Sequence, residues 1–275
     1  MVTSRFPMRT IIHVSDLHFG RVDPAILTPL LEFIRGTEPD LVAISGDLTQ
    51  RARRREYLAA REFLRAIPFP QIVVPGNHDV PLHNLFSRFV RSLDRYQRYI
   101  TNDLQPFFCD EELAVAGVNT ARALTWKDGR INVRQLSDLR KTFSKVPADR
   151  TRIVVTHHPF DLPADTRGRV VGRSRLAIKT IAECQVDLLL AGHFHIADVG
   201  YTAKRYTLPG YSALIVSSGT STSTRGRGQP NSLNKICIEP ATVRIQRLVW
   251  KPEEAMFEGL TIERFHRTPA GWIRE

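Results

Sequence analysis

Five short segments of the chain are rich in residues that bind metal ions in proteins, and each follows an apolar run typical of a strand. They are Asp16-Leu17-His18, Gly46-Asp47, Gly76-Asn77-His78-Asp79, His157-His158 and Gly192-His193-Phe194-His195. Because open α/β sheets bind ligands at the carboxyl ends of their strands, the segments are predicted to converge on one crevice. Oxygen and imidazole donors without a thiolate favour Mn²⁺, Fe or Zn²⁺ over Ca²⁺ or a structural zinc ion.

The number and order of these segments carry more weight than any one of them. A single Gly-Asp or Asp-x-His often marks a strand-end turn, where the aspartate caps a helix. One ion would need only three or four donors, whereas seven groups fit two metals bridged by a carboxylate. The seven are Asp16, His18, Asp47, Asn77, His157, His193 and His195. The sequence therefore predicts a two-metal site that acts on phosphoesters.

Repeated strand–helix units position the first three segments. Apolar runs at Thr10–Val14, Leu41–Ile44 and Ile72–Val74 alternate with helical patterns at Ala25–Arg35 and Arg54–Ile67. The three segments follow one another at intervals of about 30 residues, the length of one βαβ unit. Parallel strands with crossover helices are the expected result.

The later part of the chain continues with one more unit and then becomes mainly β. Helices are predicted at Val133–Phe143 and Ser174–Cys184, and strands at Phe107–Cys109, Leu113–Val118, Arg152–Thr156, Val186–Leu190, Val199–Tyr206, Ala213–Ser217, Leu233–Ile238 and Thr242–Trp250. This order predicts a second sheet made largely from the C-terminal part and packed on the first. We expect one domain over residues 1–275, with residues 252–275 as a further hairpin or a loosely held extension.

The five segments, in this order, resemble the motif series of the calcineurin-like metallophosphoesterase superfamily: D-x-H, G-D, G-N-H-D/E, a lone H and G-H-x-H. The resemblance implies an α/β (α+β) fold, a four-layer αββα sandwich of two mixed β-sheets flanked by helices. It also implies a dinuclear metal site at the strand C-terminal ends. By motif position, Asp16, His18 and His195 would hold the first metal, Asn77, His157 and His193 the second, and Asp47 would bridge them.

His157 is favoured over His158 because the family's later block reads V-x-x-H with a proline two residues on, matching Val154 to His157 and Pro159. His158 would then lie beside the ligands. Two ions roughly 3.5–4 Å apart would hold a bridging hydroxide that attacks phosphorus. His78 is predicted to protonate the leaving alkoxide or stabilise the transition state, with Asp79 orienting its ring.

Charge and composition only partly narrow the classes of molecule that the protein binds. Of the 39 basic residues behind the net charge of +11, seven are lysine. Arginine binds phosphate bidentately, so anionic partners are favoured, although an arginine-rich soluble surface explains the charge equally well. The polar Met1–Arg9 stretch is too short for a signal peptide and no run approaches a membrane span, so a cytoplasmic protein is expected. Three widely spaced cysteines predict reduced thiols.

The residues within these motifs are most similar to those of the branch of class III cyclic-nucleotide phosphodiesterases and glycerophosphodiesterases. This similarity implies hydrolysis of a small phosphodiester. Two basic loops are candidates for contacting the rest of the substrate, one with Arg173 and one with Arg225 and Arg227. Solvated flexible loops are the competing interpretation. Arg225 is the favoured contact because it lies in a turn of small polar residues.

Three other functions stay open at this point. Leu85–Ile100 predicts a basic amphipathic helix, which either covers the core or contacts a membrane surface as a peripheral anchor. The membrane alternative would make the enzyme a pyrophosphohydrolase of a nucleotide-linked lipid precursor. A nuclease fits the basic charge, but no nucleic-acid module is recognisable, and it ranks lower. A non-enzymatic scaffold would be expected to lack ligands. The oligomeric state stays open.

Overall fold

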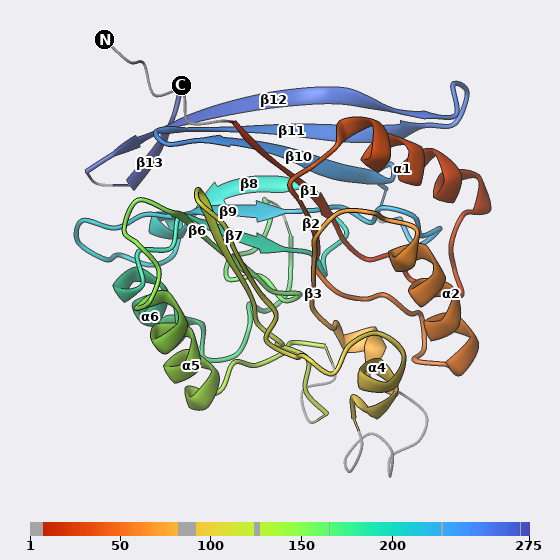
Figure 1. Ribbon diagram of the computed structural model, residues 1–275, viewed down its shortest axis with the longest axis horizontal. Coiled ribbons are helices and arrows are strands. Elements are labelled where there is room, and N and C mark those ends of the chain that lie inside the picture. The colour runs from red at the N-terminus through yellow and green to blue at the C-terminus, as the bar shows by residue number, and fades with distance from the viewer. Residues whose placement is uncertain (1–7, 82–91, 124–126, 165, 227, 270) are drawn as a thin grey trace.

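Two mixed β-sheets packed face to face, with helices on both outer faces, form the centre of the computed structural model (Figure 1). The structure describes residues 8–81, 92–123, 127–164, 166–226, 228–269 and 271–275. Helices α1 (Pro24–Thr37) and α2 (Arg54–Arg65) lie on one side, and α5 (Val133–Phe143) and α6 (Ser174–Glu183) lie on the other. The predicted four-layer αββα arrangement is confirmed.

The first sheet has seven strands in the order β13-β12-β11-β10-β1-β2-β3. Its members are β1 (Arg9–Val14), β2 (Leu41–Ile44), β3 (Gln71–Val73), β10 (Ser232–Glu239), β11 (Thr242–Lys251), β12 (Met256–Thr268) and β13 (Gly271–Arg274). The strands β1, β2 and β3 are parallel, while β10 to β13 are antiparallel neighbours. The carboxyl ends of β1 to β3 therefore open at one edge of the sheet, as the βαβ spacing predicted.

The second sheet has six strands in the order β4-β5-β6-β7-β9-β8. Its members are β4 (Phe107–Cys109), β5 (Leu113–Gly117), β6 (Thr151–Val155), β7 (Leu188–Ala191), β8 (Asp198–Tyr201) and β9 (Leu214–Ser217). The strands β5, β6, β7 and β9 are parallel, and β4 and β8 are antiparallel edge strands. A short 3₁₀ turn, η2 (Thr202–Lys204), follows β8.

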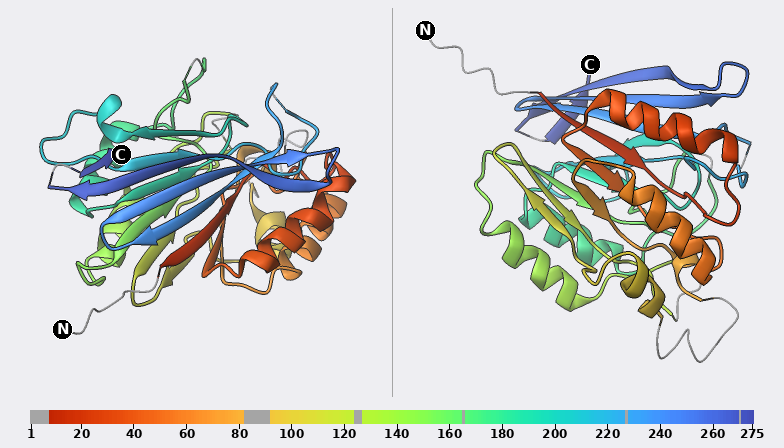
Figure 2. Two further views of the ribbon diagram at one scale, coloured as in Figure 1. Left: turned by 90° about the horizontal axis from the view of Figure 1, so that it is seen from above. Right: turned by 45° about the vertical axis from the view of Figure 1, so that its right-hand side comes forward.

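The predicted origin of the second sheet is wrong. Strands β10 to β13 join β1, with Ile236 opposite Ile11, so the C-terminal part extends the first sheet and the middle of the chain forms the second. Figure 2 shows these strands beside β1. Apolar alternation could not distinguish the two sheets, because both present the same kind of apolar inner face. Of the two alternatives for residues 252–275, a paired hairpin is the one observed.

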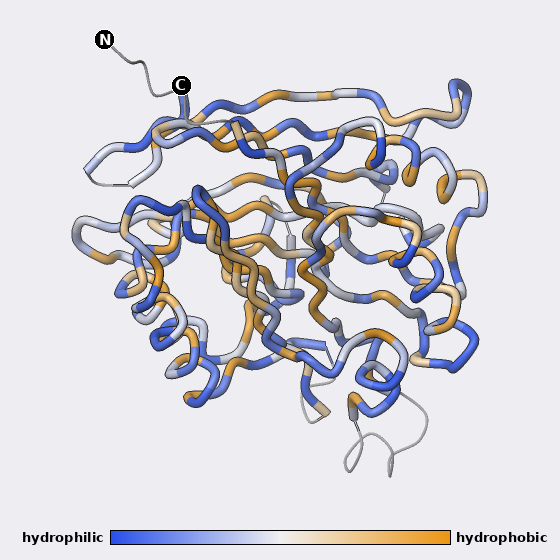
Figure 3. Tube along the Cα trace, in the orientation of Figure 1, coloured by the Kyte–Doolittle hydropathy of each residue, from blue (hydrophilic) through white to orange (hydrophobic). Residues whose placement is uncertain are grey.

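Three apolar layers hold the four structural layers together. One layer lies between α1, α2 and the first sheet, and includes Ile26, Tyr57 and Val42. A second lies between the sheets and includes Ile11 and Val155, and a third lies under α5 and α6. Figure 3 shows the apolar residues following the strands through the interior. Because both faces of the parallel strands are buried, β2 is apolar at every position.

Helix termini follow their sequence signals. The Asp23 side chain accepts a hydrogen bond from the Ala25 amide at the start of α1, and Asn132 does the same for Gln135 at the start of α5. Within the predicted Leu85–Ile100 helix, the structure has α4 (Asp94–Tyr99), and residues 85–91 lie outside the described residues. Among the described residues, none of the helices has the length and apolar content that crossing a membrane requires.

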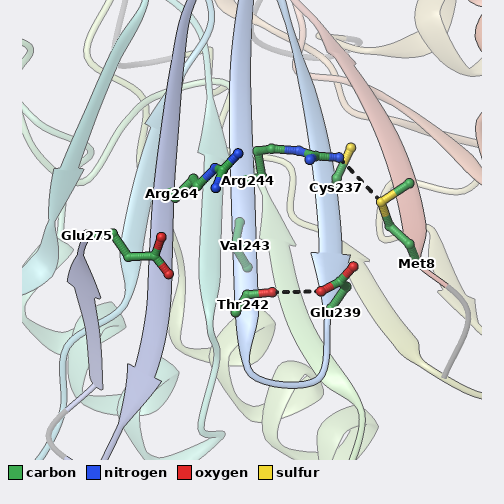
Figure 4. A pocket seen from close by; sticks show the side chains of 8 residues that line it. All are labelled: Met8, Cys237, Glu239, Thr242, Val243, Arg244, Arg264 and Glu275. Carbon is green, nitrogen blue, oxygen red and sulfur yellow. Dashed lines mark hydrogen bonds between the residues drawn. The ribbon is translucent and has the colours of Figure 1, made fainter. Parts of the chain in front are cut away.

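A pocket on strands β10 to β12 is shown in Figure 4, and its lining includes no residue of the five ligand segments. Its lining includes two arginines, Arg244 and Arg264, and two glutamates, Glu239 and Glu275. Thr242 donates a hydrogen bond to Glu239 at 3.0 Å. The acidic and basic groups balance, so this pocket carries no excess charge toward an anionic substrate.

Asp187 joins the two sheets, and its loss is expected to destabilise the fold. Its carboxylate accepts from the Arg152 amide at 2.9 Å and from Trp272 Nε1 at 3.3 Å, and it pairs with Arg267. In Asp187→Ala, the buried donors lose their acceptor, which costs about 2 kcal/mol of the free energy of unfolding. Urea unfolding measures this loss. Asp149→Ala, at a carboxylate 69% exposed, is the control and should change stability by less than about 0.5 kcal/mol.

Candidate metal centre

The five ligand segments lie just beyond the carboxyl ends of β1, β2, β3, β6 and β7. Five of the predicted ligands have a left-handed backbone, which L-residues other than glycine adopt at a conformational cost. The φ angles are 52° at Asp16, 49° at His18, 51° at Asp47, 78° at His193 and 59° at His195. Such a concentration of unfavourable φ values at strand ends indicates a functional constraint on where these side chains point.

Asp16, His18 and His195 form the first of two clusters. Asp16 Oδ1 lies 3.3 Å from His195 Nε2 and 3.6 Å from His18 Nε2, and the two imidazole nitrogens are 3.3 Å apart. Asp16 Oδ2 is held by Ser15 Oγ at 2.6 Å and by the His193 amide at 3.0 Å. Asp16 Oδ1 is buried and makes no hydrogen bond within the described part of the chain. An unsatisfied carboxylate oxygen facing two imidazole nitrogens fits a bound cation.

Asn77, His157 and His193 form the second cluster. His157 Nε2 lies 3.2 Å from Asn77 Oδ1 and 3.3 Å from His193 Nδ1. His157 Nδ1 donates to the Ser45 carbonyl oxygen at 2.8 Å, which fixes the ring and directs Nε2 into the cluster. Asn77 begins a 3₁₀ turn, η1 (Asn77–Asp79), directly after β3. The arrangement offers one amide oxygen and two imidazole nitrogens to a second cation.

Asp47 lies between the two clusters. Its Oδ2 is 3.7 Å from His18 Nε2 in the first cluster and 3.4 Å from His157 Nε2 in the second. Its Oδ1 accepts from the His78 amide at 2.8 Å, which orients the carboxylate. A single carboxylate that reaches both clusters is the geometry required of a bridging ligand. The structure thus brings together all seven residues that the motif pattern selected.

Burial and charge leave most of these groups in the protonation state that binds cations. Burial would raise the pKa values of Asp16 and Asp47, but the surrounding imidazoles hold both well below the usual range. Burial lowers the pKa of His193 to about 3 and that of His195 to about 4, so both rings are neutral. His157 is the exception, because the Asp47 charge outweighs burial and raises its pKa to about 9.

His158 lies close enough to the second cluster to compete with His157 as a ligand. Its Nδ1 is 2.7 Å from Thr120 Oγ1, and its Nε2 is buried without a hydrogen bond among the described residues. One nitrogen from each of His157, His158 and His193 lies within 4.8 Å of the others. Only His157 also reaches Asp47, which favours it as the ligand.

Metal analysis of two alanine variants separates these histidines. His157→Ala is expected to lower the metal content of the purified protein by about one ion per chain, whereas His158→Ala keeps both. Loss of a group that only supports a ligand weakens metal affinity about 10–100-fold, so dialysis at excess metal should still fill the site. Elemental analysis measures the content. Full metal content in His157→Ala together with loss in His158→Ala would reverse the assignment.

Two motif glycines are required because a ligand side chain occupies the space of their absent Cβ. A Cβ at Gly76 would overlap Asp47 Oδ1, and one at Gly192 would overlap Ser15 Oγ and lie 2.5 Å from Asp16 Oδ2. Gly76→Ala is therefore expected to displace the Asp47 carboxylate and reduce metal content below that of the wild type. Elemental analysis and thermal melting check this. Gly36→Ala, where nothing lies within 4 Å, is the control and should keep its metals.

His78 does not have the surroundings predicted from the sequence. Its Nδ1 donates to the Gln50 carbonyl at 2.8 Å, and its Nε2 accepts from Arg225 Nη1 at 2.9 Å. The Asp79 carboxylate instead accepts hydrogen bonds from the amides of Leu48, Thr49 and Gly76. The prediction that Asp79 orients the His78 ring is wrong, because these amides use its oxygens. A backbone carbonyl such as that of Gln50 leaves no signal in a sequence.

Arg225 reaches the centre from a loop that is bound along the first ligand segment. Thr220 and Thr222 donate to the carbonyls of Asp16 and Leu17, each at 2.7 Å. The amide of Thr224 donates to the Arg21 carbonyl at 2.9 Å. This hydroxyl-rich loop fixes the position from which Arg225 extends. The turn of small polar residues that favoured Arg225 in the sequence is the same loop.

The other two arginines selected from the sequence have no such contacts. Arg173 is exposed at the N-terminus of α6, and its side chain makes no hydrogen bond or ion pair with the described residues. Arg227 lies outside the described residues. Arg225 is therefore the one predicted substrate contact that the described part of the chain brings to the ligands.

Comparison with known proteins finds relatives whose names describe phosphodiesterases. The 162 matched residues are 28% identical to a probable glycerophosphodiester phosphodiesterase GpdQ of Arcobacter nitrofigilis, covering 58% of this chain and 57% of that protein. A probable cyclic nucleotide phosphodiesterase of Rhodopseudomonas palustris is 28% identical over 200 residues, which are 66% of this chain and 70% of the relative. The chain thus spans little more than half the length of the glycerophosphodiesterase.

Solved structures share the fold at low sequence identity. Purple acid phosphatase PPD1 from yellow lupin has a TM-score of 0.68 at 13% identity, covering 92% of this chain and 53% of that one. A dimetal phosphatase from Danio rerio has a TM-score of 0.62 at 13% identity, covering 87% and 95%. The family model for calcineurin-like phosphoesterases matches residues 9–197, which include all five ligand segments. This chain belongs to the calcineurin-like phosphoesterase family.

Proposed function

We propose that the protein is a metal-dependent phosphodiesterase that hydrolyses a cyclic nucleotide or a glycerophosphodiester. The observation that supports this most directly is the position of the Asp47 carboxylate between two clusters of carboxylate, amide and imidazole groups. Two divalent ions at these clusters, Mn²⁺, Fe or Zn²⁺, would supply Lewis-acid polarisation of the phosphoryl group and a hydroxide nucleophile at neutral pH.

In this proposal the chain's own residues hold the ions and the substrate. Asp16, His18 and His195 would hold one ion, Asn77, His157 and His193 would hold the other, and Asp47 would be shared between them. Ser15 and Ser45 hold two of these side chains in orientation, through Asp16 Oδ2 and His157 Nδ1. The positively charged side chain near the ligands, Arg225, is available to the phosphoryl oxygens of a substrate.

The choice of a diester rests on the relatives. The names of the glycerophosphodiester phosphodiesterase and of the cyclic nucleotide phosphodiesterase reported above describe diester hydrolysis. A diester carries one negative charge, and two divalent cations with Arg225 would supply more positive charge than the Asp16 and Asp47 carboxylates offset. A membrane-surface pyrophosphohydrolase and a nuclease are the alternatives, and residues 85–91 of the amphipathic Leu85–Ile100 helix on which the membrane alternative depends lie outside the described residues.

A substrate screen with the Mn²⁺-loaded protein tests the proposal. Bis-p-nitrophenyl phosphate and its monoester are compared with cAMP, glycerophosphodiesters, UDP-linked lipids and single-stranded DNA at fixed salt. Turnover of small diesters well above that of the other classes is the expected result. Preference for the lipid or for DNA would identify one of the alternatives. Absence of diester hydrolysis with every divalent metal would exclude the proposed activity.

A further inference from the structure

We infer that Arg225 is the residue that contacts the phosphoryl group of the substrate, and that His78 acts by holding Arg225 in position. This inference rests on the proposed phosphodiesterase function and specifies how the substrate is bound there. It differs from the role expected from the sequence, in which His78 itself protonates the leaving group.

The hydrogen bonds of His78 define its orientation. The Gln50 carbonyl can only accept, so His78 Nδ1 carries the hydrogen of the 2.8 Å contact between them. A guanidinium can only donate, so His78 Nε2 is the acceptor of the 2.9 Å contact with Arg225 Nη1. With both nitrogens used in this way, the ring has no proton directed at a leaving group. His78 Nε2 instead accepts a hydrogen bond that fixes the guanidinium of Arg225.

Arg225 has the donors and the surroundings of an anion-binding residue. Its contact with His78 uses one of the five N–H groups of the guanidinium, and no carboxylate pairs with it among the described residues. The side chain is partly buried, and its loop is bound to the backbone of the Asp16 segment. The remaining donors can form two parallel hydrogen bonds to two oxygens of a phosphate. Arginine can bind phosphate in this bidentate way, whereas lysine acts as a point charge.

The position of the pair places these donors beside the metal ligands. The His78 ring lies edge-on to the His18 ring, with centroids 4.9 Å apart, and the His78 amide donates to the bridging candidate Asp47. A phosphoryl group bound at both clusters would therefore lie beside His78, where the Arg225 guanidinium can contact it.

The leaving group distinguishes the two possible roles of His78. A general acid matters most when a poor leaving group, such as an alkoxide, must be protonated, and much less for p-nitrophenolate. A residue that positions Arg225 affects binding and transition-state charge equally for both leaving groups. In the inferred mechanism, the departing alkoxide takes its proton from water.

The test is a double-mutant cycle on the Mn²⁺-loaded protein. The variants His78→Ala, Arg225→Ala and the double variant are assayed with bis-p-nitrophenyl phosphate and with glycerophosphoethanolamine. We expect Arg225→Ala to lower kcat/KM about 10²-fold on both substrates, the typical effect of removing one transition-state donor. His78→Ala should lose a similar factor on both, and the double variant should be no worse than Arg225→Ala.

Three controls separate positioning from general structural damage. Arg225→Lys should recover part of the lost kcat/KM, because it restores the charge without the fork of donors. Arg134→Ala, at an arginine of α5 whose side chain is 92% exposed, should match the wild type. Melting temperature and metal content should be unchanged in both His78→Ala and Arg225→Ala, because neither side chain belongs to the predicted ligand set.

Two results would overturn the inference. One is a loss in His78→Ala that is at least tenfold larger for glycerophosphoethanolamine than for bis-p-nitrophenyl phosphate. The other is multiplication of the two single losses in the double variant. Titration with inorganic phosphate tests Arg225 even if the wild type hydrolyses no diester, which is the failure of the proposed function. Affinity for phosphate should fall at least tenfold in Arg225→Ala, and unchanged affinity would exclude Arg225 as the anion contact.

Discussion

Replacing Asp47 by asparagine is expected to abolish phosphodiester hydrolysis, the largest effect of any single substitution in this chain. Asp47 Oδ2 lies 3.7 Å from His18 Nε2 and 3.4 Å from His157 Nε2, so both clusters lose their shared negative charge at once. A catalytic metal contributes several kcal/mol of transition-state stabilisation. At about 1.4 kcal/mol per tenfold change in rate, the loss is about 10³-fold or more. Steady-state kinetics and elemental analysis of the same sample measure turnover and metal content together.

Asp79→Asn is the matched control for this substitution. Asp79 is also a buried carboxylate within the ligand segments, but its oxygens accept hydrogen bonds from backbone amides and do not face the clusters. Asp79→Asn should retain both metals and most of the turnover, with some loss of thermal stability. Equal loss of turnover in the two variants, with metals retained in Asp79→Asn, would give Asp79 a direct role and contradict the arrangement described above.

The clustering of the ligands could be predicted because it depends on strand ends alone. In a parallel sheet every strand of the βαβ series ends at the same edge, so ligands placed one unit apart must meet there. The segments after β1 and β2 therefore meet as expected, and Asp16 and Asp47 offer ligand atoms within 4.8 Å of each other. The family resemblance added which of the ligands would share a metal.

Other features depend on contacts that local sequence does not encode. The strand's own apolar pattern does not specify the place of β10 beside β1, whereas the segment after Ser217 has hydroxyl groups that bond to the backbone near Asp16, at the end of β1. The contact between Arg225 and His78 joins positions far apart in the chain. A pattern of residue types can nominate each residue separately, but only the folded chain shows that they touch.

Removing divalent metals with a chelator is expected to abolish activity and to lower the melting temperature. The buried carboxylates of Asp16 and Asp47 have pKa values well below the usual range and stay ionised, and Asp16 Oδ1 makes no hydrogen bond within the described residues. Cations at the two clusters would pair with these charges in the folded state alone. At a metal concentration 100-fold above the dissociation constant, binding adds about 2.7 kcal/mol of stability.

Differential scanning calorimetry measures this effect as a rise of about 5 °C in melting temperature on adding Mn²⁺ to the chelated protein. Activity should return with the same Mn²⁺ titration. Asp47→Asn is the internal control: because its clusters lack the shared carboxylate, its melting temperature should respond little to Mn²⁺. An equal rise in both proteins would show that the stabilising ions bind outside the two clusters. If chelation leaves both the melting temperature and the activity of the wild type unchanged, these residues do not form a metal centre, because a buried carboxylate that needs a cation cannot lose it without cost.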